Sequence, residues 1–290
     1  MDMNGFINPD LTVSRKHGHL SKSTIQIFRS LIYRFYSGYG REFPWRHTRD
    51  PYRILVSEIM LQQTQVERVL EKYEIFIERF PNVGALAHAP FEEVLSVWQG
   101  LGYNRRCLSL KRSAERIVAE HGGAVPHTME VLTKLPGIGP ATAAGILCFA
   151  YGKPALYLET NIRTLFIHLF FTGRDGVHDR EIRPLVEQTL DRENPREWYF
   201  ALMDYGSMLK REVGNLNARS RHYTKQSPFK GSNRQLRGRI LALLLNRPRL
   251  TTAQIIASLQ ADTENVVKII GILEREGFIH RNGLTYNISS

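Results

Sequence analysis

The spacing of apolar residues between about Ser23 and Leu209 constrains the fold more than any other feature of this sequence. Apolar residues recur there at helical intervals, and almost no stretch shows the apolar–polar alternation typical of a half-buried strand. Short motifs containing Pro and Gly interrupt the pattern and indicate where helices end. The sequence therefore predicts a body that is nearly all-α. The interrupting motifs are Phe43-Pro44-Trp45, Arg79-Phe80-Pro81, Gly100-Leu101-Gly102, Gly122-Gly123 and Leu135-Pro136-Gly137-Ile138-Gly139.

Changes in composition divide the chain into four segments. Residues 1–22 form a polar N-terminal lead-in, and residues 23–209 form the helical body. Residues 210–234 form a basic connector, and residues 235–290 carry a separate pattern of helices and strands. We therefore expect one large domain and one small C-terminal domain, which suits a chain of 290 residues.

The connector is strongly basic. From Lys210 to Arg239 the chain has nine Lys or Arg residues and one acid, Glu212. Such a segment either lies on a polyanion or is a solvated linker, and both interpretations stay open. The side chains that we expect to make the polyanion contacts are Lys210, Arg219, Arg221, Lys225 and Lys230.

The C-terminal segment combines predicted helices with a predicted hairpin. Three apolar-rich stretches indicate helices, and two short stretches that include aromatic and β-branched residues indicate strands. The Asn282-Gly283 pair between the strands is a strong turn signal. This order resembles a winged helix, whose third helix could enter a DNA major groove, although many winged helices bind proteins. The predicted helices cover residues 235–246, 252–259 and 263–277, and the strands cover 278–281 and 284–288.

Composition and charge indicate a globular protein with a polyanionic partner. Of all residues, 42% are hydrophobic and 23% are charged, as in ordinary soluble domains. The net charge of +11 and the isoelectric point near 9.8 favour nucleic acid as the partner. We see no apolar run long enough to span a bilayer and no secretion signal, so we expect a cytoplasmic, nucleoid-associated protein without a membrane partner.

The cysteine content argues against several kinds of site. Cys107 and Cys148 are the only two cysteines in the chain. A disulfide framework is not expected, and two thiolates cannot supply a four-thiolate zinc or iron–sulfur centre. We accordingly expect no metal, no iron–sulfur cluster and no other cofactor.

One carboxylate lies at the border of an apolar helix. In the segment Ser57-Glu58-Ile59-Met60-Leu61-Gln62-Gln63-Thr64-Gln65-Val66, Glu58 comes one turn after Ile54 and three residues before Leu61. A carboxylate at that border is partly withdrawn from water, which suits it to donate a proton near neutrality. A glutamate tied to a nearby Arg or backbone amide is the alternative interpretation.

The motif Leu135-Pro136-Gly137-Ile138-Gly139-Pro140 predicts a tight turn between two helices. A helix is expected to end at Leu135, and Pro140 suits the first turn of the next helix. The turn exposes backbone amides at a helix N-terminus, where a phosphate can bind. An ordinary helix–turn–helix corner is the alternative. The residues that we expect to contact a phosphate are Pro136, Gly137 and Gly139.

A second polar cluster, Leu158-Glu159-Thr160-Asn161-Ile162-Arg163, precedes an apolar helix from Leu165 to Phe171. Thr160 or Asn161 is expected to cap this helix. Glu159 either complements the helix dipole or serves as a second active-site acid.

Taken together, these motifs resemble the helix-hairpin-helix superfamily of DNA glycosylases, and within it the adenine glycosylases that act on adenine opposite guanine or oxidised guanine. The similarity runs from about Tyr36 to Gly206, which is well over half the chain. It implies a two-lobed helix-hairpin-helix glycosylase fold, followed here by the winged-helix-like domain. The matching stretches are Pro44-Trp45-Arg46, Pro51-Tyr52, the Ser57-to-Val66 segment, Arg79-Phe80-Pro81, Trp98-Gln99-Gly100-Leu101-Gly102-Tyr103, the Leu135-to-Gly139 turn and Leu202-Met203-Asp204-Tyr205-Gly206.

The resemblance also implies roles for individual residues. Glu58 is expected to protonate N7 of adenine, and Glu159 to stabilise the positively charged sugar with Asn161 in support. Trp45 and Arg46 match residues that line the pocket for the extruded base. A base has to leave the duplex before this chemistry reaches it, and the vacated space needs a wedge. Residues that match those entering or bordering the base stack are Gln62, Gln63 and Tyr103.

This chain departs from the family pattern in three places. Glu159 stands where the family has aspartate, which adds one methylene at a position that affects the rate. The four cysteines usually found after the Leu202-to-Gly206 motif are absent, so a cluster-dependent DNA contact is not expected. The winged-helix-like segment stands in place of the family's domain for reading oxidised guanine, which leaves the opposite base open.

The resemblance implies a base excision repair glycosylase that leaves an abasic site. Bifunctional members carry a lysine two residues after the second glycine of the turn, and this chain has Ala141 there, so a monofunctional enzyme is expected. Its partner would be double-stranded DNA with a mispair or lesion, bound by a monomer. One alternative is a glycosylase for thymine or uracil opposite guanine, or for a deaminated purine. Another is a non-catalytic DNA-binding regulatory protein.

Overall fold

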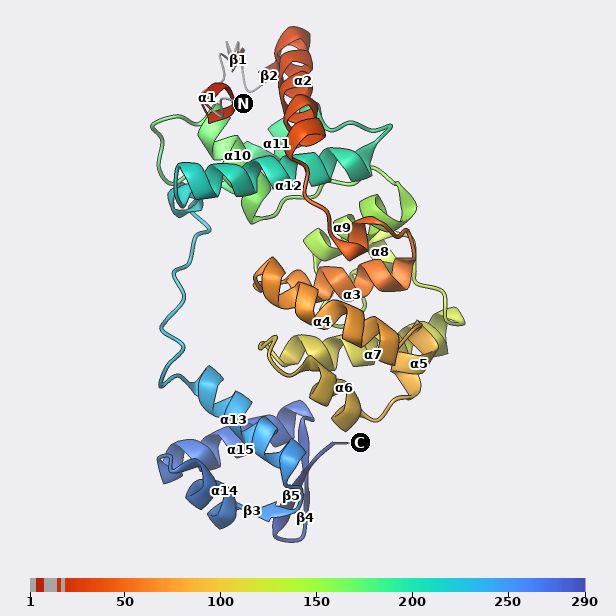
Figure 1. The fold of residues 1–290 in the computed structure, drawn as a ribbon, viewed down its shortest axis with the longest axis vertical. Helices are drawn as coiled ribbons and strands as arrows, with labels where there is room; N and C mark the ends of the chain where they lie inside the picture. Colours follow the sequence, from red (N-terminus) through yellow and green to blue (C-terminus); the bar gives the residue numbers. More distant parts are fainter. Residues whose placement is uncertain (1–3, 8–14, 17–18, 290) are drawn as a thin grey trace. The chain divides into compact units, whose positions relative to one another are not determined.

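The computed structural model describes residues 4–7, 15–16 and 19–289, and the chain divides into two compact units (Figure 1). The first unit takes its described residues from Met1–Ile54, His127–Thr133 and Ile138–Lys225. The second takes its described residues from Leu55–Pro126, Lys134–Gly137 and Gln226–Ser290. Each unit is therefore built from three separate stretches of the sequence.

Helices make up most of the first unit, as the apolar spacing predicts. A short antiparallel strand pair, in which Arg15 lies opposite Leu20, precedes the first long helix. The elements of this unit are α1 Asn4–Ile7, β1 Arg15–Lys16, β2 His19–Leu20, α2 Lys22–Tyr39, η1 Pro44–Arg46, α8 Met129–Leu132, α9 Pro140–Tyr151, α10 Thr160–Phe170, α11 Asp179–Thr189, α12 Pro195–Glu212 and η2 Leu216–Arg219, where η marks a 3₁₀ helix.

Aromatic rings fill the core of the first unit, where α12 contacts both α2 and α10. Phe28 of α2 makes edge contacts with Phe166 and Phe170 of α10 and with Trp198 of α12, at centroid distances of 5.3 to 5.8 Å. Such edge-to-face contacts add stability beyond the burial of the rings, by roughly 0.5–1.5 kcal/mol per pair. This core holds the first turn of α10 in place beside α12.

The second unit combines a helical layer with the C-terminal domain. Its first part contains the helix that carries Glu58 and a long helix, Arg105–His121. The helix α3, Pro51–Leu61, begins in the last residues of the first unit's stretch Met1–Ile54 and continues into the second unit. The other elements of the second unit are α4 Val66–Arg79, α5 Val83–His88, α6 Phe91–Trp98, α7 Arg105–His121, α13 Asn233–Asn246, β3 Leu250–Thr251, α14 Thr252–Leu259, α15 Thr263–Glu276, β4 Ile279–Asn282 and β5 Thr285–Ile288.

The C-terminal domain contains the three predicted helices and a small antiparallel sheet with the strand order β3-β5-β4. The prediction of a nearly all-α body therefore holds, and the small domain has the predicted helices and hairpin together with one further strand, β3. β3 was not predicted, because two residues are too short to show any periodicity. The hairpin itself is confirmed. The predicted turn is displaced by one residue: Asn282 pairs with Thr285, so the loop is Gly283-Leu284, with Gly283 at φ +60° as the first loop position of a type II′ turn requires.

Local capping explains why the helices of this domain were predicted closely. Thr251 and Gln254 form a reciprocal capping box at the start of α14. Asp262 accepts a hydrogen bond from the Asn265 amide at the start of α15. This helix ends at Glu276, one residue before the predicted end, because Gly277 adopts a left-handed conformation with φ +83°.

The lead-in predicted at residues 1–22 lies partly outside the described residues. Within the described part, α1 places the Phe6 ring against Phe35, Tyr39 and Tyr205, at centroid distances of 5.4 to 6.3 Å. The polar composition of the lead-in did not indicate this aromatic anchor. It ties the described residues 4–7 to α2 and α12.

The first part of the predicted connector is folded onto the first unit. α12 extends to Glu212, beyond the predicted body end at residue 209, and η2 follows it. Backbone hydrogen bonds of 3.0 Å join Val177 to Arg219 and Arg221 in a short parallel bridge. The residues from 226 onward belong to the second unit, so the change of unit falls within the connector. Nowhere in the described chain is there a helix with both the length and the apolar character needed to cross a membrane.

Candidate functional site

Glu58 lies on α3 at the edge of a buried face. Ile54, Leu55 and Ile59 on the same helix are buried, whereas Glu58 is half-buried. At the start of α3, Asp50 accepts a hydrogen bond of 2.8 Å from the Tyr52 amide and so caps the helix. The structure thus places this carboxylate on a rigid helix at the boundary between core and surface, as the sequence predicts.

Arg106 holds the other end of α3, and sequence reasoning did not identify it. Its guanidinium donates to the carbonyl oxygens of Ile59 and Met60 at 2.9 and 2.7 Å. It also donates to the carbonyl of Gln62 and to Oγ1 of Thr64. Burial lowers the pKa of Arg106 to about 10. A cation that donates to the last carbonyls of a helix stabilises that end, so Arg106 positions the helix that carries Glu58.

The residues predicted to meet the base stack separate into two groups. Gln62 donates from Nε2 to the carbonyl of Gly137 at 3.2 Å and so joins the end of α3 to the Pro136-Gly137 turn. Gln63 and Tyr103 instead meet at Gln226: Tyr103 donates to its Oε1 at 2.8 Å, and Gln226 donates to Oε1 of Gln63 at 3.3 Å. Sequence reasoning missed Gln226, because no local pattern relates it to residues so far away in the chain.

Gln63 and Tyr103 also share an unusual backbone conformation. Their φ angles are +54° and +48°, and only four non-glycine residues in the described chain have positive φ. Side chains other than glycine adopt this region at a cost in energy, and such positions cluster at functional sites. The conformation therefore supports a functional role for both residues.

The turn before α9 differs in detail from the prediction. α8 ends at Leu132 and not at Leu135, and only Gly137 has a left-handed backbone, with φ +76°. A Cβ at Gly137 would lie 2.7 Å from Cβ of Ser109, so glycine is required there on two grounds. Gly139 has φ −85° and serves as the N-cap of α9, with Pro140 at the first helical position as predicted.

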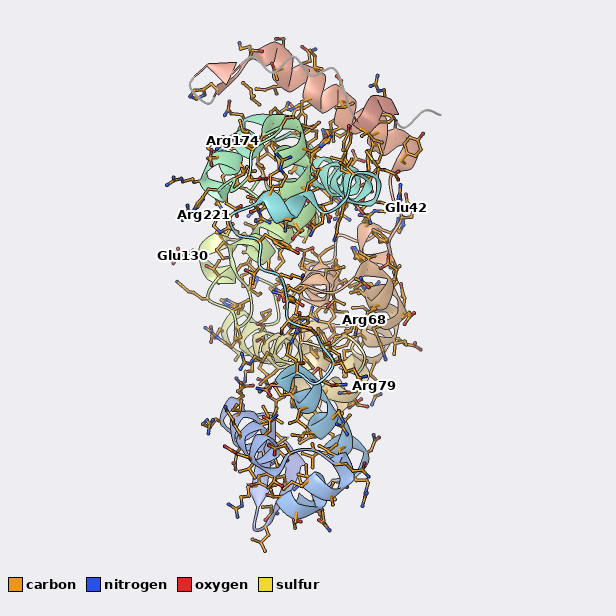
Figure 2. The ribbon with its side chains drawn as sticks, turned by 90° about the vertical axis from the view of Figure 1, so that its left-hand side faces the viewer. Glu42, Arg68, Arg79, Glu130, Arg174 and Arg221 are labelled. Atoms are coloured by element: carbon orange, nitrogen blue, oxygen red, sulfur yellow. The ribbon has the colours of Figure 1, made fainter. Side chains whose placement is uncertain are left out.

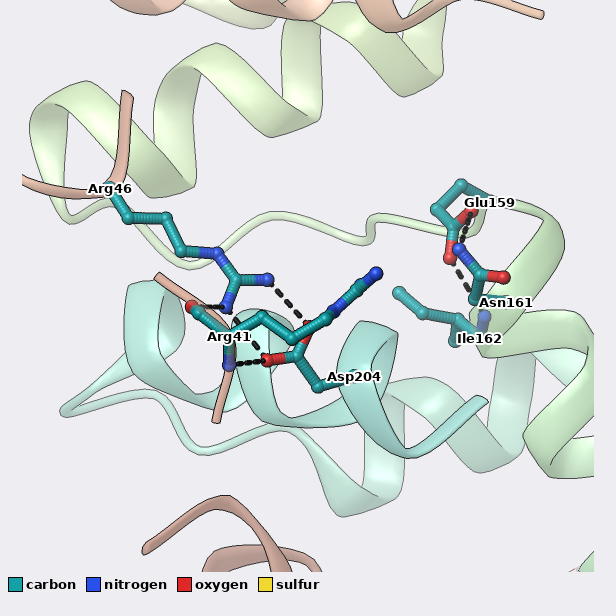
Figure 3. A network of polar contacts seen from close by, with 6 residues as sticks. All are labelled: Arg41, Arg46, Glu159, Asn161, Ile162 and Asp204. Atoms are coloured by element: carbon teal, nitrogen blue, oxygen red, sulfur yellow. Dashed lines mark hydrogen bonds and ion pairs between the residues drawn. The ribbon is translucent and has the colours of Figure 1, made fainter. Parts of the chain in front are cut away.

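Glu159 is itself the cap of α10, and the prediction that Thr160 or Asn161 would cap this helix is wrong (Figure 3). Its Oε1 accepts a hydrogen bond of 2.8 Å from the Ile162 amide, and Oε2 accepts one of 3.3 Å from Nδ2 of Asn161. The extended backbone of Glu159 gives its long side chain room to fold back onto the helix start. The structure therefore brings Glu159 and Asn161 together as the resemblance implies.

The environment of Glu159 raises the pKa of its carboxyl above the ordinary value. Burial raises the pKa of the Glu159 carboxyl, and this effect exceeds the opposing effect of the hydrogen bonds at Asn161 and Ile162. The positive charges of Arg163 and Arg41 also oppose it. A carboxyl with a raised pKa at a helix start has the character of an active-site group.

Trp45 and Arg46, the predicted base-pocket residues, lie on η1. Arg46 belongs to a network of polar contacts with Arg41 and Asp204 (Figure 3). Both terminal nitrogens of Arg46 donate to the Asp204 carboxylate at 2.8 Å, and Arg41 donates to the same carboxylate from its amide and Nε at 2.8 Å. The Asp204 side chain is only 1% exposed. Trp45 is buried and stacks on Phe43 with ring centroids 5.2 Å apart. Arg46 thus fixes the position of η1, and its contact with an extruded base stays a prediction.

Gly206 brings α12 into direct contact with the first turn of α10. A Cβ at Gly206 would lie 2.0 Å from the carbonyl oxygen of Asn161, which leaves no room for any side chain. Gly206 belongs to the Leu202-to-Gly206 motif that carries part of the family resemblance. The motif therefore serves the packing of α12 against the Glu159–Asn161 turn, a role that the sequence did not reveal.

The basic residues of the connector differ in their exposure and therefore in how readily they can contact a polyanion. Arg219 forms an ion pair with Asp175 at 3.1 Å and is only 24% exposed, so its charge is partly neutralised. Arg221, labelled in Figure 2, follows η2 and donates its backbone amide to the Val177 carbonyl of the first unit. The exposed residues of the predicted set are Lys210, Arg221, Lys225 and Lys230.

The described residues contain no group of three His, Cys, Asp or Glu side chains that could hold a metal ion. Cys107 and Cys148 are both buried as free thiols. Burial raises the pKa of the Cys107 thiol, so it is not disposed to bind a metal as a thiolate.

Comparison with known proteins shows the family of this chain. The family model for HhH-GPD superfamily base excision DNA repair proteins matches residues 56–190. The thymine/uracil-DNA glycosylase of Pyrobaculum aerophilum is 30% identical over 190 residues, which cover 61% of this chain and 80% of that protein. The chain therefore belongs to the HhH-GPD superfamily of base excision DNA repair proteins, and its resemblance to DNA glycosylases is confirmed.

Adenine DNA glycosylases are also among the relatives. The protein of Buchnera aphidicola is 33% identical over 64% of this chain, and the human protein is 32% identical over 68%. The matched regions span 54% and 38% of those two proteins, so this chain corresponds to about half of their length or less.

Solved structures agree on the fold. A thermostable thymine-DNA glycosylase superposes with a TM-score of 0.58 at 29% identity, covering 63% of this chain and 86% of that one. A trapped endonuclease III–DNA intermediate gives a TM-score of 0.53 at 21% identity, which shows a shared fold. The matched family region contains Glu58, Arg106 and Glu159 and ends before Gln226.

Proposed function

We propose that this chain is a monofunctional DNA glycosylase that removes adenine opposite guanine or oxidised guanine and leaves an abasic site. The observation that carries the proposal is Glu58 on the rigid helix α3, inside the family-matched region and one turn before the Gln62-Gln63-Thr64 block. That block and the adenine glycosylases among the relatives support adenine as the base.

The residues suggest a division of chemical work. Glu58 protonates N7 of the extruded adenine, and the bond from the base to the sugar then breaks with the electron pair leaving on the base. The Glu159 carboxylate, supported by Asn161, stabilises the positive charge that develops on the sugar until water adds to it. Ala141, exposed in the first turn of α9, offers no amine to attack the sugar, which supports hydrolysis without strand cleavage.

The share of each relative's length that this chain matches favours a second candidate for the excised base. This chain matches 80% and 85% of the length of two thymine/uracil-DNA glycosylases, but only about half or less of the adenine glycosylases named above. Thymine or uracil opposite guanine is therefore the second candidate. A non-catalytic DNA-binding protein is the third, and the presence of Glu58 argues against it.

The proposed partner is double-stranded DNA with one mispair or lesion, bound by a monomer at the nucleoid. The exposed N-terminus of α9 offers amides to a phosphate, and exposed Lys210, Arg221, Lys225 and Lys230 add positive charge. We further propose that the C-terminal domain is a winged helix, since its element order α13-β3-α14-α15-β4-β5 and its three-stranded sheet suit that fold.

The test is a panel of duplexes, each with one mispair or lesion, scored for strand breakage after alkali. We expect breakage at adenine opposite guanine or oxidised guanine, and no breakage without alkali. Breakage only at thymine or uracil would favour the second candidate. Tight binding without base release from any duplex would favour the third.

Glu58→Gln tests the role of the acid on the best duplex of that panel. It should abolish base release and largely keep duplex affinity, because Gln keeps the shape and cannot donate an acidic proton. Glu74→Gln, the same change at an exposed position on α4, is the matched control and should keep the rate. Near wild-type single-turnover rates for Glu58→Gln would remove Glu58 from the mechanism.

A further inference from the structure

A groove in the second unit combines family-matched residues with residues beyond the family match. One wall is the loop before α7, which includes Tyr103 and contacts Arg68, and the other is formed by residues 226–229 and by α13. Six arginines line it, and none of its described lining residues is Asp or Glu. The lining arginines are Arg68, Arg105, Arg106, Arg234, Arg237 and Arg239.

Three of these arginines form no ion pair with any carboxylate that the structure describes. Arg105 and Arg237 both form ion pairs with Glu276, and Arg106 is committed to the end of α3. The other three donate to uncharged oxygens among the described residues. Arg68 donates to the Gly100 carbonyl, and Arg239 donates to the Leu259 carbonyl. Arg234 donates to the Ser227 carbonyl and to the side-chain oxygens of Tyr103 and Gln226.

Aromatic side chains accompany this charge. Phe229 is 61% exposed, which is unusual for a large apolar residue, and Tyr103 is half-exposed beside it in the lining of the groove. A positively charged groove with exposed aromatic rings is the arrangement with which proteins hold nucleic acid strands, because the charges meet phosphates and the rings meet bases.

We propose that this groove binds a DNA strand, with Arg68, Arg234 and Arg239 at the phosphates and Phe229 stacked on a base or sugar. Gln226 then extends the pair Gln63 and Tyr103, to which it is hydrogen-bonded. The proposal rests on the proposed function in one respect, namely that Gln63 and Tyr103 meet the duplex. It assigns DNA contacts to residues 226–239, which lie outside the family-matched region.

The hydrogen bonds of Arg234 suggest how the groove is kept open for a strand. Arg234 joins the Ser227 carbonyl at 2.6 Å to Oε1 of Gln226 at 3.2 Å. It therefore orders the 226–229 segment while its charge faces the groove. Arg234→Ala removes both the charge and this ordering, whereas Arg234→Lys keeps the charge and loses the planar fork of donors.

The experiment compares duplex affinity over a range of salt concentrations for wild type, Arg234→Ala, Arg234→Lys and Arg247→Ala. Arg247 is exposed just after α13 and outside the groove, so it is the matched control for charge. For Arg234→Ala we expect the slope of log affinity against log salt to fall by about one unit, and affinity to fall roughly fivefold at about 0.15 M salt. Arg247→Ala and Arg234→Lys should keep the wild-type slope.

Equal slopes for Arg234→Ala and Arg247→Ala, with equal melting temperatures, would overturn the proposal. Base release at saturating enzyme separates this outcome from a failure of the proposed function. We expect Arg234→Ala to release base as fast as wild type under those conditions. If wild type released no base, the proposed function would fail. The comparison of salt slopes would still show whether the groove binds DNA.

The fluorescence of Phe229→Trp independently tests whether the side chain at position 229 stacks on DNA. The three native tryptophans, Trp45, Trp98 and Trp198, are buried, so the new indole would be the exposed emitter. Saturating duplex should quench its emission, since stacking on a base quenches indole. Unchanged emission would overturn the stacking. Quenching by polyglutamate as strong as that by DNA would overturn DNA as the occupant and indicate an acidic protein instead.

Discussion

Glu159 combines a structural bond with a position suited to catalysis. One of its carboxylate oxygens caps α10 and the other accepts from Asn161, so its methylene chain bends back over the helix start. Aspartate, the residue that the family resemblance leads us to expect, is among the most favoured N-cap residues. The longer glutamate keeps the same cap bond, which explains how the substitution is compatible with the fold.

We predict that Glu159→Gln slows base release by at least about tenfold, or about 1.4 kcal/mol in barrier height, because the negative charge is lost. Glu159→Asp should keep activity, because Asp retains the charge and can still cap the helix. Single-turnover rates and melting temperatures of both variants check this. A Gln variant that is fast and only slightly less stable would reduce Glu159 to a cap.

The pKa of Glu159 leads to a prediction for stability. Because burial raises it above the ordinary 4.5, the folded state keeps a proton that the unfolded state gives up as the pH rises past that value. Wild type should therefore lose stability relative to Glu159→Gln as the pH rises from about 4.5 through the raised pKa. Urea unfolding of both proteins between about pH 4 and pH 7 measures this difference. A relative gain for wild type would show that burial does not dominate.

At the scale of helices, the close approach of α12 to α10 should be the least tolerant contact near the candidate site. We predict that Gly206→Ala costs about 3 kcal/mol or more in the free energy of unfolding, since its Cβ would meet the Asn161 carbonyl at 2.0 Å. Base release should also fall, because the turn that carries Glu159 would have to shift.

Gly38→Ala is the matched control for that substitution. Gly38 is exposed near the end of α2, and a Cβ there would meet nothing within 4 Å. It should gain about 0.5 kcal/mol in stability, because alanine favours the helix over glycine. Equal effects of the two substitutions, measured by denaturant unfolding, would show that α12 and α10 are less closely packed than described.

The end of α3 allows a comparison of adjacent arginines. Arg106→Met should cost about 3 kcal/mol, because it removes the charged donor to the buried carbonyls of Ile59 and Met60. Arg105→Met should cost less than about 1 kcal/mol, because Arg105 is 71% exposed in its pair with Glu276. Denaturant unfolding checks both, and similar costs would argue against a special role for Arg106.

Elements with local signals were predicted well from the sequence, and long-range contacts were not. α14 was predicted over its full range, and its start is set by a local signal, the capping box of Thr251 and Gln254. The hairpin turn was displaced because Asn282-Gly283 and Gly283-Leu284 are both acceptable turn pairs, and the register of β4 and β5 decides between them.

The same distinction applies to the candidate site. Glu58, Glu159 and Asn161 were found through ordered motifs. Arg106 and Gln226 were missed, because the contacts that relate them to the site, with Thr64 and Tyr103, span 42 and 123 residues and no periodicity connects them. The cap on α10 was misassigned because glutamate is seldom an N-cap, and only the packing of its side chain shows that it is one here.

For the whole molecule, the basic residues behind the net charge of +11 differ in whether they are paired with acids or free to meet a polyanion. Some basic residues, such as Arg46 and Arg163, are consumed by ion pairs inside the first unit. Others line the groove of the second unit or lie exposed along the connector. Part of the charge available to a polyanion, including Arg221, Lys225, Lys230, Arg234 and Arg239, therefore lies beyond the end of the family match at residue 190.

We predict that active protein contains no iron and shows no visible iron–sulfur absorption. The chain has two cysteines, both buried, and a cluster held by the protein needs four ligands. Elemental analysis of active protein, set against its absorption spectrum, checks this. Stoichiometric iron in active enzyme would mean that ligands other than these thiols hold a cluster.

The division of the sequence between the two units has a consequence for inheritance. Each unit is assembled from three stretches, so one crossover within residues 55–225 joins parts of two parental units whose packing evolved separately. A crossover after Lys225 instead replaces the terminal stretch Gln226–Ser290 in a single event and leaves the family-matched residues 56–190 intact. Such an exchange would still have to preserve the contacts between the tail and the rest of the second unit, such as the ion pair of Glu276 with Arg105 and the packing of Phe278 on Phe91.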